Sequence, residues 1–298
     1  MTGPPTERRN PNTLAIDSLG TTQILELVNA EDAKVAGAVS ASIPDLTKAV
    51  DAAVEAVHAG GRVNYFGAGT SGRLAVQDAA ELPPTFHAPP DLVIAHHAGG
   101  NAALLRAVED VEDNEQAGES DAGAVTGHDV VIGVAASGRT PYVAGALRAA
   151  HAAGATTVLI TANPDAPLRD LADIVIAADT GPEVIAGSTR LKAGTAQKMI
   201  LNAFSTTLMI KLGRTWSNLM VDMVATNSKL RGRMLRILAE ATGADEEACA
   251  AALAATDGEL KPALVHLLSG ASVGEARAAL AAADGRVTEA LSTLVQTA

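Results

Sequence analysis

The chain has few aromatic residues and a single cysteine, and each shortage excludes a class of protein. Aromatic residues make up 2% of the 298 residues and hydrophobic residues 48%, so Ala, Val, Leu and Ile must build the core. Such a composition is too apolar for a disordered chain. Cys249 has no partner for an internal disulfide, which indicates a reducing compartment.

Basic residues are also scarce. The chain has 22 Lys and Arg against 34 Asp and Glu, a formal net charge of −12. This balance argues against a nucleic-acid partner, which would require a basic surface. It leaves room for a small anionic substrate, because backbone N–H groups at helix N-termini bind phosphate whatever the overall charge.

No long hydrophobic run is present. The longest uncharged apolar stretch, residues 199–210, lies between Lys198 and Lys211 and is too short to span a bilayer. The first residues lack the basic-then-apolar pattern of a signal peptide. We therefore expect a soluble, cytoplasmic protein with no membrane partner.

Short apolar runs alternate with helical patterns in the middle of the chain. The runs that predict strands are 63–66, 92–95, 129–135, 157–160 and 174–176. Continuous apolar strands separated by helices are typical of a parallel sheet covered on both faces. The predicted fold class is therefore α/β.

Composition divides the chain into three predicted parts. Residues 1–20 are polar and Pro-rich, which suggests an extended N-terminal arm. Residues 21–243 form the α/β domain with flanking helices, helical over 21–59 and mainly helical over 194–243. Residues 244–298 contain a repeat, Leu-Ala-Ala-Thr-Asp-Gly and then Leu-Ala-Ala-Ala-Asp-Gly, which predicts a small helical, UBA-like bundle without chemistry of its own.

Two strand-to-helix turns are rich in glycine and hydroxyl groups. The first is Gly-Ala-Gly-Thr-Ser-Gly at 67–72, and the second is Ser-Gly-Arg-Thr at 137–140. Glycine lets the backbone approach a ligand, and the next helix presents free N–H groups beside the hydroxyls. Such turns lie at the carboxyl edge of a parallel sheet, where ligands bind. Both turns therefore predict a phosphate site.

Other interpretations of these turns are open. The first turn matches G-x-G-x-x-G, but the next strand ends in His96 and His97 where a dinucleotide enzyme usually has an acid. Arg73 replaces the last glycine of a G-x-S-x-G nucleophile elbow. A third interpretation is that both are tight turns without a ligand. No H-E-x-x-H pattern occurs, and we predict no metal.

Several segments resemble one enzyme family. They are residues 6–11 (Thr-Glu-Arg-Arg-Asn-Pro), 67–73, 78–85 (Asp-Ala-Ala-Glu-Leu-Pro-Pro-Thr), 135–142, 187–198, and 218–222 continuing to Ala-Thr-Asn at 225–227. In this order they are similar to the N-acetylmuramic acid 6-phosphate etherases. The resemblance implies a SIS-type α/β/α sandwich with a parallel sheet, a homodimer and no cofactor. It also implies a lyase that releases D-lactate from N-acetylmuramic acid 6-phosphate in the recycling of cell-wall sugars.

The resemblance also points to two catalytic glutamates, Glu81 and Glu112. Glu81 is expected where the helix from the first turn ends, before Pro83 and Pro84 stiffen the chain, although a solvated carboxylate is the commoner fate. Glu112 lies in a run of acids that by itself suggests a solvated helix face, so only the resemblance selects it. We assign Glu81 as the acid that acts on lactate and Glu112 as the base at C2.

The expected substrate contacts come mainly from the two turns: Gly69, Thr70, Ser71, Ser137, Gly138, Arg139 and Thr140. The alternative role for Arg139 is to cap a helix. Ser188 and Lys192 are further candidates, and the alternative for Lys192 is a surface cation. Two other functions stay open: a non-catalytic, sugar-phosphate-sensing SIS regulator, and an aldose–ketose isomerase, which needs no acid for a leaving group.

Overall fold

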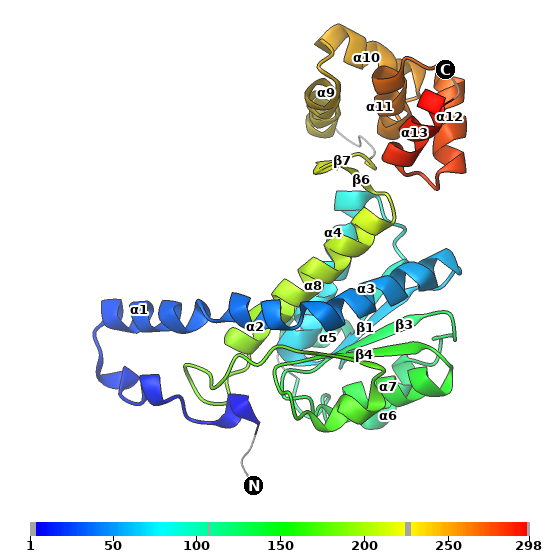
Figure 1. Cartoon of the computed structure of the whole chain (residues 1–298). Helices are drawn as coiled ribbons and strands as arrows, with labels where there is room; N and C mark the ends of the chain where they lie inside the picture. The colour runs from blue at the N-terminus through cyan, green and yellow to red at the C-terminus, as the bar shows by residue number, and fades with distance from the viewer. Residues whose placement is uncertain (1–3, 107, 224–227, 297–298) are drawn as a thin grey trace. The chain divides into compact units, whose positions relative to one another are not determined.

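The computed structural model describes residues 4–106, 108–223 and 228–296 (Figure 1). Contacts between residues divide the chain into two units. The first contains residues 1–80 and 90–205, and the second contains residues 81–89 and 206–298. The family segment at 225–227 lies outside the described residues.

The first unit is built on a five-stranded parallel sheet in the order β2-β1-β3-β4-β5. The strands are β1 (Val63–Gly67), β2 (Val93–His97), β3 (Val130–Val134), β4 (Thr156–Thr161) and β5 (Ile174–Ala177). Each of the five predicted strands is present, with ends moved by one or two residues. β1 and β3 are buried at every position, as expected for central strands of a covered sheet.

Helices cover both faces of this sheet (Figure 1). On one face, α7 (Pro141–Ala152) packs on β1, β3 and β4, with α6 (Glu115–Asp121) beside it. Phe66 belongs to the apolar cluster on that face. The preceding residue, Tyr65, points the other way and meets Phe204 of α8 (Lys192–Lys211), with ring centroids 6.2 Å apart. This alternation confirms the predicted α/β/α sandwich.

Further helices flank the sheet. The predicted helical segment 21–59 forms three helices, α1 (Thr21–Asp32), α2 (Val35–Ala41) and α3 (Ile43–His58). α4 (Gly69–Phe86) starts at the first turn, and the short α5 (Gly100–Leu105) follows β2. A further 3₁₀ helix, η4 (Pro167–Leu171), connects β4 to β5.

The N-terminal arm is folded onto the first unit. It forms three short 3₁₀ helices, η1 (Pro5–Glu7), η2 (Pro11–Thr13) and η3 (Ile16–Ser18), where an extended segment was predicted. Thr6, Asn10 and Thr13 are buried. Proline at the first position fixes φ for a helical turn, which accounts for η1 and η2.

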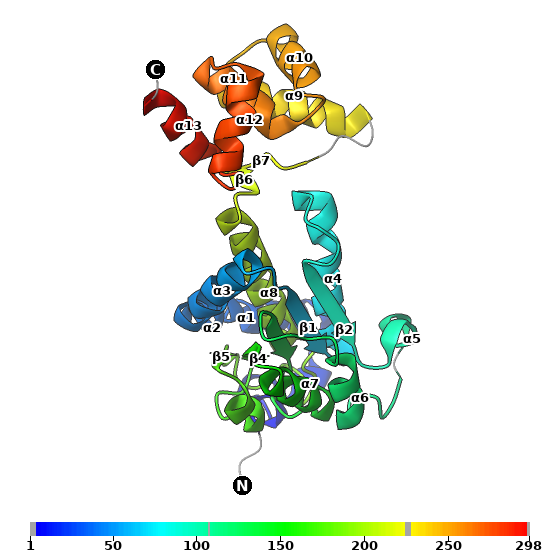
Figure 2. The ribbon, with the colours of Figure 1, turned by 90° about the vertical axis from the view of Figure 1, so that its right-hand side faces the viewer.

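The second unit has a short hairpin and five helices in its described part (Figure 2). These are β6 (Thr215–Trp216), β7 (Leu219–Met220), α9 (Ser228–Thr242), α10 (Glu246–Ala255), α11 (Leu260–Ser269), α12 (Val273–Ala282) and α13 (Val287–Gln296). The repeat is visible as two helix pairs, each joined by an Asp-Gly turn with both residues at positive φ. α9 packs with these helices, and a separate domain at 244–298 stays a prediction.

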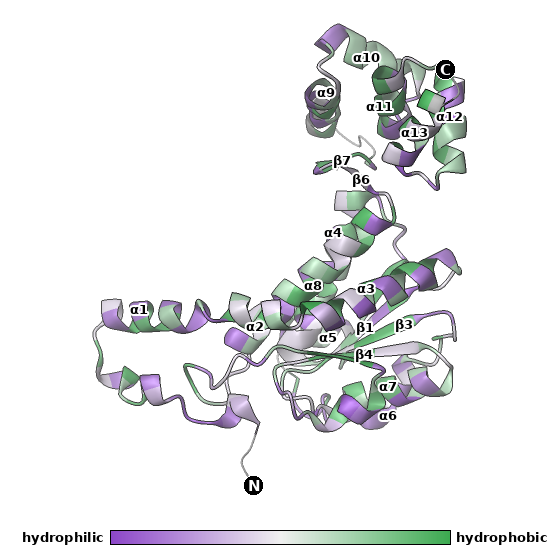
Figure 3. Ribbon diagram, in the orientation of Figure 1, coloured by the Kyte–Doolittle hydropathy of each residue, from purple (hydrophilic) through white to green (hydrophobic). Residues whose placement is uncertain are grey.

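Hydropathy follows this architecture. Figure 3 shows strands β3 and β4 coloured mainly as hydrophobic, and helices with hydrophilic residues at intervals along their length. Within the described ranges, no helix is both long enough and apolar enough to cross a membrane.

Candidate active site

The first turn depends on a close approach between two glycines. A Cβ on Gly72 would lie 2.5 Å from the carbonyl oxygen of Gly67 and 2.6 Å from a ring carbon of His97. Gly69 has φ of +54°, a left-handed conformation that side chains disfavour. These contacts turn the chain sharply from β1 into α4 and bring Thr70 and Ser71 to the edge of the sheet.

The second turn, at the end of β3, also depends on a glycine with positive φ and a close contact. Gly138 has φ of +66°, and a Cβ there would overlap the side chain of Ala166. Thr140 precedes Pro141, the first residue of α7. Gly138 therefore shapes the turn, and its neighbours Ser137 and Arg139 carry the polar groups.

The two turns line one hollow of about 300 Å³. β1 and β3 are neighbours and run parallel, so the turns after them meet at the same edge of the sheet. The lining residues are Glu7, Ala68, Gly69, Thr70, Ser71, Glu112, Asp113, Ala136, Ser137, Arg139, Thr140, Pro141, Gly187 and Thr189. We call this hollow the turn pocket. It brings together six of the seven turn residues predicted to bind substrate, together with Glu112; Gly138 is not among the lining residues.

Glu112 reaches the pocket from a loop. The acidic run before it was predicted to be a helix face, which is wrong: residues 108–114 connect α5 to α6 without helical structure. Asp110 has a positive φ of 63°, which a continuous helix does not allow. The loop is held to α7 because the backbone N–H of Tyr142 donates to the Glu112 carbonyl at 3.0 Å.

Glu81 is exposed on α4, the helix that begins at the first turn, and it is not among the residues that line the turn pocket. The prediction that the helix ends there is wrong, because α4 continues through Pro83 and Pro84 to Phe86. Leu82 and Phe86 lie four residues apart on one helix face and are both buried. Their burial offsets the hydrogen bonds that the prolines cannot donate.

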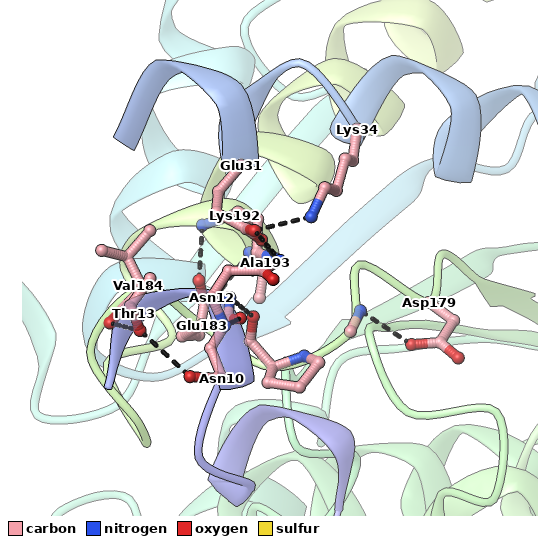
Figure 4. A network of polar contacts seen from close by, with 12 residues as sticks. Asn10, Asn12, Thr13, Glu31, Lys34, Asp179, Glu183, Val184, Lys192 and Ala193 are labelled. Atoms are coloured by element: carbon pink, nitrogen blue, oxygen red, sulfur yellow. Dashed lines mark hydrogen bonds and ion pairs between the residues drawn. The ribbon is translucent and has the colours of Figure 1, made fainter. Parts of the chain in front are cut away.

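Lys192 and Ser188 also lie outside the pocket lining, although Gly187 and Thr189 belong to it. Lys192 is not a surface cation: it is 1% exposed, and its Nζ lies 2.7 Å from Glu31 Oε2 (Figure 4). The second oxygen of Glu31 accepts from Lys34 at 2.6 Å and from Asn12 at 2.9 Å. Burial raises the pKa of Glu31, but these donors outweigh it and lower the pKa to about 2.

Glu183 completes this cluster. It is fully buried, and its two oxygens accept the backbone N–H groups of Lys192 and Ala193, each at 2.9 Å, where α8 begins. Burial raises the pKa of Glu183, and the N–H donors oppose that rise. We call Glu31, Lys192 and Glu183 the polar clamp.

Hydrogen bonds in both directions connect the N-terminal arm to the loop before α8. Thr13 donates to the Val184 carbonyl at 2.8 Å and Asn10 to the Pro182 carbonyl at 3.2 Å (Figure 4). The N–H of Gly187 donates to the Thr6 carbonyl at 2.8 Å. These bonds carry Glu7 to the pocket, where sequence reasoning had not placed it.

Seven lining residues were not predicted from the sequence: Glu7, Ala68, Asp113, Ala136, Pro141, Gly187 and Thr189. Gln197, which meets Ser71 at 2.9 Å, was not predicted either. Glu7, Gly187, Thr189 and Gln197 lie in the segments 6–11 and 187–198 that carry the family resemblance, which was the available signal. In the part of the chain that the structure describes, no three His, Cys, Asp or Glu side chains are grouped as metal ligands would be.

Similarity to known proteins covers nearly the whole chain. A SIS domain model matches residues 103–207, and the glucokinase regulatory protein N-terminal SIS domain model matches residues 45–151. The structure of a phosphoheptose isomerase from Francisella tularensis matches 62% of this chain and 98% of its own chain at 19% identity, with a TM-score of 0.49.

Curated relatives are much more similar. The N-acetylmuramic acid 6-phosphate etherase of Thermobifida fusca (strain YX) is 60% identical over 265 residues, which are 89% of this chain and 87% of that protein. The protein of the same name from Salmonella enteritidis PT4 is 52% identical over 273 residues, 91% of this chain and 92% of that protein. The resemblance seen in the sequence is thereby confirmed, and the chain belongs to the N-acetylmuramic acid 6-phosphate etherase family.

Proposed function

We propose that this protein is a lyase that cleaves the D-lactyl ether of N-acetylmuramic acid 6-phosphate. The products are N-acetylglucosamine 6-phosphate and D-lactate, as expected for recycling of cell-wall sugars. The observation that carries the proposal is 60% identity to an etherase over 89% of the chain. The turn pocket supports it, because hydroxyl and glycine turns lie beside a carboxylate there.

The two turns bind the phosphate group of the substrate. Thr70, Ser71, Ser137 and Thr140 supply hydroxyl donors, and Arg139 supplies positive charge. Gly69 and Gly138 allow the backbone to come close to the anion. Ser188 and Lys192 do not line the pocket, so we assign them an indirect role: Ser188 belongs to the loop that carries Gly187 and Thr189, and Lys192 pairs with Glu31 where α8 begins.

The two glutamates perform an elimination followed by a hydration. Opening of the sugar ring gives a C1 aldehyde, which acidifies the proton on C2. Glu112 removes that proton, a C2–C3 double bond forms, and the C3–O bond breaks while Glu81 protonates the departing lactate oxygen. Water then adds at C3 and restores the sugar. Proton transfer of this kind requires two positioned acid–base groups.

The working form is a homodimer in the cytoplasm, with no cofactor and no nucleic-acid partner. The large apolar side chains of Leu14, Leu25 and Ile185 are 56%, 63% and 54% exposed, which favours burial against a second subunit. Light scattering on the purified protein measures the assembly directly, and a monomer would remove this part of the proposal.

One alternative has an observation in its favour. The match to the glucokinase regulatory protein domain covers residues 45–151, which include both turns and both glutamates. A sugar-phosphate sensor needs the turns but no acid or base. Binding of N-acetylmuramic acid 6-phosphate without turnover would establish the sensor instead of the etherase.

The deciding experiment is a lactate-release assay with purified protein and N-acetylmuramic acid 6-phosphate. We expect D-lactate, and in ¹⁸O-labelled water we expect the label at C3 of the product sugar. Label in lactate would mean hydrolysis without elimination. Absence of lactate together with isomerisation at C1 and C2 would indicate an aldose–ketose isomerase.

A further inference from the structure

A buried amide lies directly behind the first turn. Gln197 of α8 is 2% exposed and Ser71 of α4 is 8% exposed. Their side chains meet at 2.9 Å, the distance from Ser71 Oγ to Gln197 Oε1. The other face of Ser71 lines the turn pocket. Gln197 thus forms a buried hydrogen bond with Ser71, a residue predicted to bind the phosphate.

The orientation of this amide decides what Ser71 can offer to a ligand. With Oε1 toward Ser71, the hydroxyl donates its single hydrogen to Gln197, and Nε2 has no hydrogen-bond partner among the described residues. A buried N–H group without an acceptor is costly. A half-turn of the amide places Nε2 against Ser71 Oγ, so that the nitrogen donates and the hydroxyl accepts.

A phosphate monoester accepts hydrogen bonds at its charged oxygens. If the Ser71 hydroxyl donates its hydrogen to Gln197, only lone pairs of Oγ face the phosphate, and the contact is repulsive. If Nε2 donates to Oγ instead, the hydrogen of Ser71 is free to point at the phosphate. The half-turn therefore pairs the buried N–H with Ser71, moves Oε1 to the place that Nε2 occupied, and leaves the hydroxyl hydrogen of Ser71 available to the phosphate.

We propose that Gln197 is a positioning residue for substrate binding: its amide donates to Ser71 Oγ and directs the Ser71 hydroxyl hydrogen at the phosphate. The inference rests on the proposed function, because it takes the ligand at Ser71 to be a phosphate.

A purely structural role has different consequences. Gln197 is flanked on α8 by the buried residues Ala193, Ala196, Ile200 and Leu201, so an apolar side chain of equal length would fill the same space. If packing were its only role, Gln197→Met would leave ligand affinity unchanged. If it positions Ser71, the loss must appear only with phosphorylated ligands.

The test compares Gln197→Met, which donates nothing, with Gln197→Glu, which when ionised can only accept from Ser71. Thr195→Ala, at an exposed position of the same helix, is the matched control. Each variant is measured for KM and kcat in lactate release, and for binding of N-acetylglucosamine 6-phosphate and of N-acetylglucosamine. The ratio of the two affinities does not depend on the folded fraction of a variant.

We expect Gln197→Met to weaken binding of the phosphorylated sugar about 10-fold with kcat nearly unchanged. Gln197→Glu should weaken it on the order of 100-fold, because it also adds negative charge. Neither variant should change binding of the unphosphorylated sugar. Adding Gln197→Met to Ser71→Ala should cost little beyond Ser71→Ala alone, since the two residues act as one unit.

Equal affinity ratios in wild type, Gln197→Met and Gln197→Glu would overturn the inference, as would fully additive effects of the Ser71 and Gln197 changes. The two proposals fail separately. If the wild-type protein releases no lactate, the proposed function is wrong. A preference for the phosphorylated sugar that depends on Gln197 would still support the positioning role.

Discussion

The turn pocket and the polar clamp are both polar clusters of the first unit, but the charged side chains are buried and paired in the clamp and exposed in the pocket. In the clamp, Glu31 is 3% exposed and receives Lys192, Lys34 and Asn12 on its two oxygens. In the pocket, Glu112 and Arg139 are exposed to the hollow. Carboxylates whose oxygens accept from buried donors stabilise the fold, whereas those that face a hollow are available to a ligand.

The two regions are also joined physically. The clamp fixes the start of α8 and the N-terminal arm, and the loop between them brings Gly187 and Thr189 to the pocket. The comparison therefore predicts two separable kinds of variant. Changes in the pocket should alter activity in a folded protein, and changes in the clamp should alter stability first.

The largest effect is expected at the glutamates. Glu81→Gln and Glu112→Gln should each lower kcat for lactate release about 10³-fold, because an amide neither accepts nor delivers the proton. Binding of N-acetylglucosamine 6-phosphate, measured by calorimetry, should stay within a few-fold of wild type. Glu109→Gln, an exposed neighbour in the same acidic run, is the control and should keep normal turnover. Normal turnover in Glu81→Gln would remove its role as the acid.

The next effect is expected in the clamp. Lys192→Met should lower the free energy of unfolding by about 3–5 kcal/mol, because it leaves the buried carboxylate of Glu31 without its closest cation. Lys34→Met removes a partner whose side chain is 53% exposed and should cost less than about 1 kcal/mol. Urea unfolding measures both. The double change Lys192→Met with Glu31→Gln should recover part of the loss, and a loss that merely adds would contradict the pairing.

The sequence was sufficient to predict the elements that local chemistry dictates. Apolar runs predicted all five strands, and glycines with hydroxyl groups marked the two turns. Once β1 and β3 are neighbours, the meeting of Ser71 with Ser137 and Arg139 follows from the geometry of a parallel sheet. Half of the pocket was therefore accessible from sequence patterns alone.

Contacts between distant parts of the chain left no such pattern. Glu31 meets Lys192 across 161 positions, and Thr13 meets Val184 across 171. Glu183 resembles any loop glutamate until α8 places two N–H groups against it. The same reason explains the errors at Pro83 and at the acidic run, where tertiary packing overrode local propensity.

Acid should separate the clamp from the pocket as well. The pKa of Glu31 is about 2 in the folded protein against an ordinary value of 4.5 in the unfolded chain, so between these pH values the folded state binds fewer protons than the unfolded chain. The stabilisation is complete above pH 4.5 and is lost as the pH falls toward 2, on the order of 3 kcal/mol in all. Glu183, whose pKa is raised, works in the opposite direction. Urea midpoints from pH 6 to pH 3 should fall less steeply for Glu31→Gln than for wild type, and parallel curves would contradict the ion pair.

The smallest effect expected is at the hydroxyls of the pocket. Ser71→Ala removes one donor to a charged phosphate and should raise KM about 10-fold while kcat changes little. The urea midpoint should fall modestly, because the buried amide of Gln197 loses its partner. Ser137→Ala should act alike if both turns hold the same anion. Ser120→Ala, exposed on α6 away from the lining residues, should leave KM unchanged. An unchanged KM in Ser71→Ala would mean that this turn does not contact the substrate. The difference between exposed polar groups in the pocket and buried ones in the clamp would then be a property of the fold without a consequence for substrate binding.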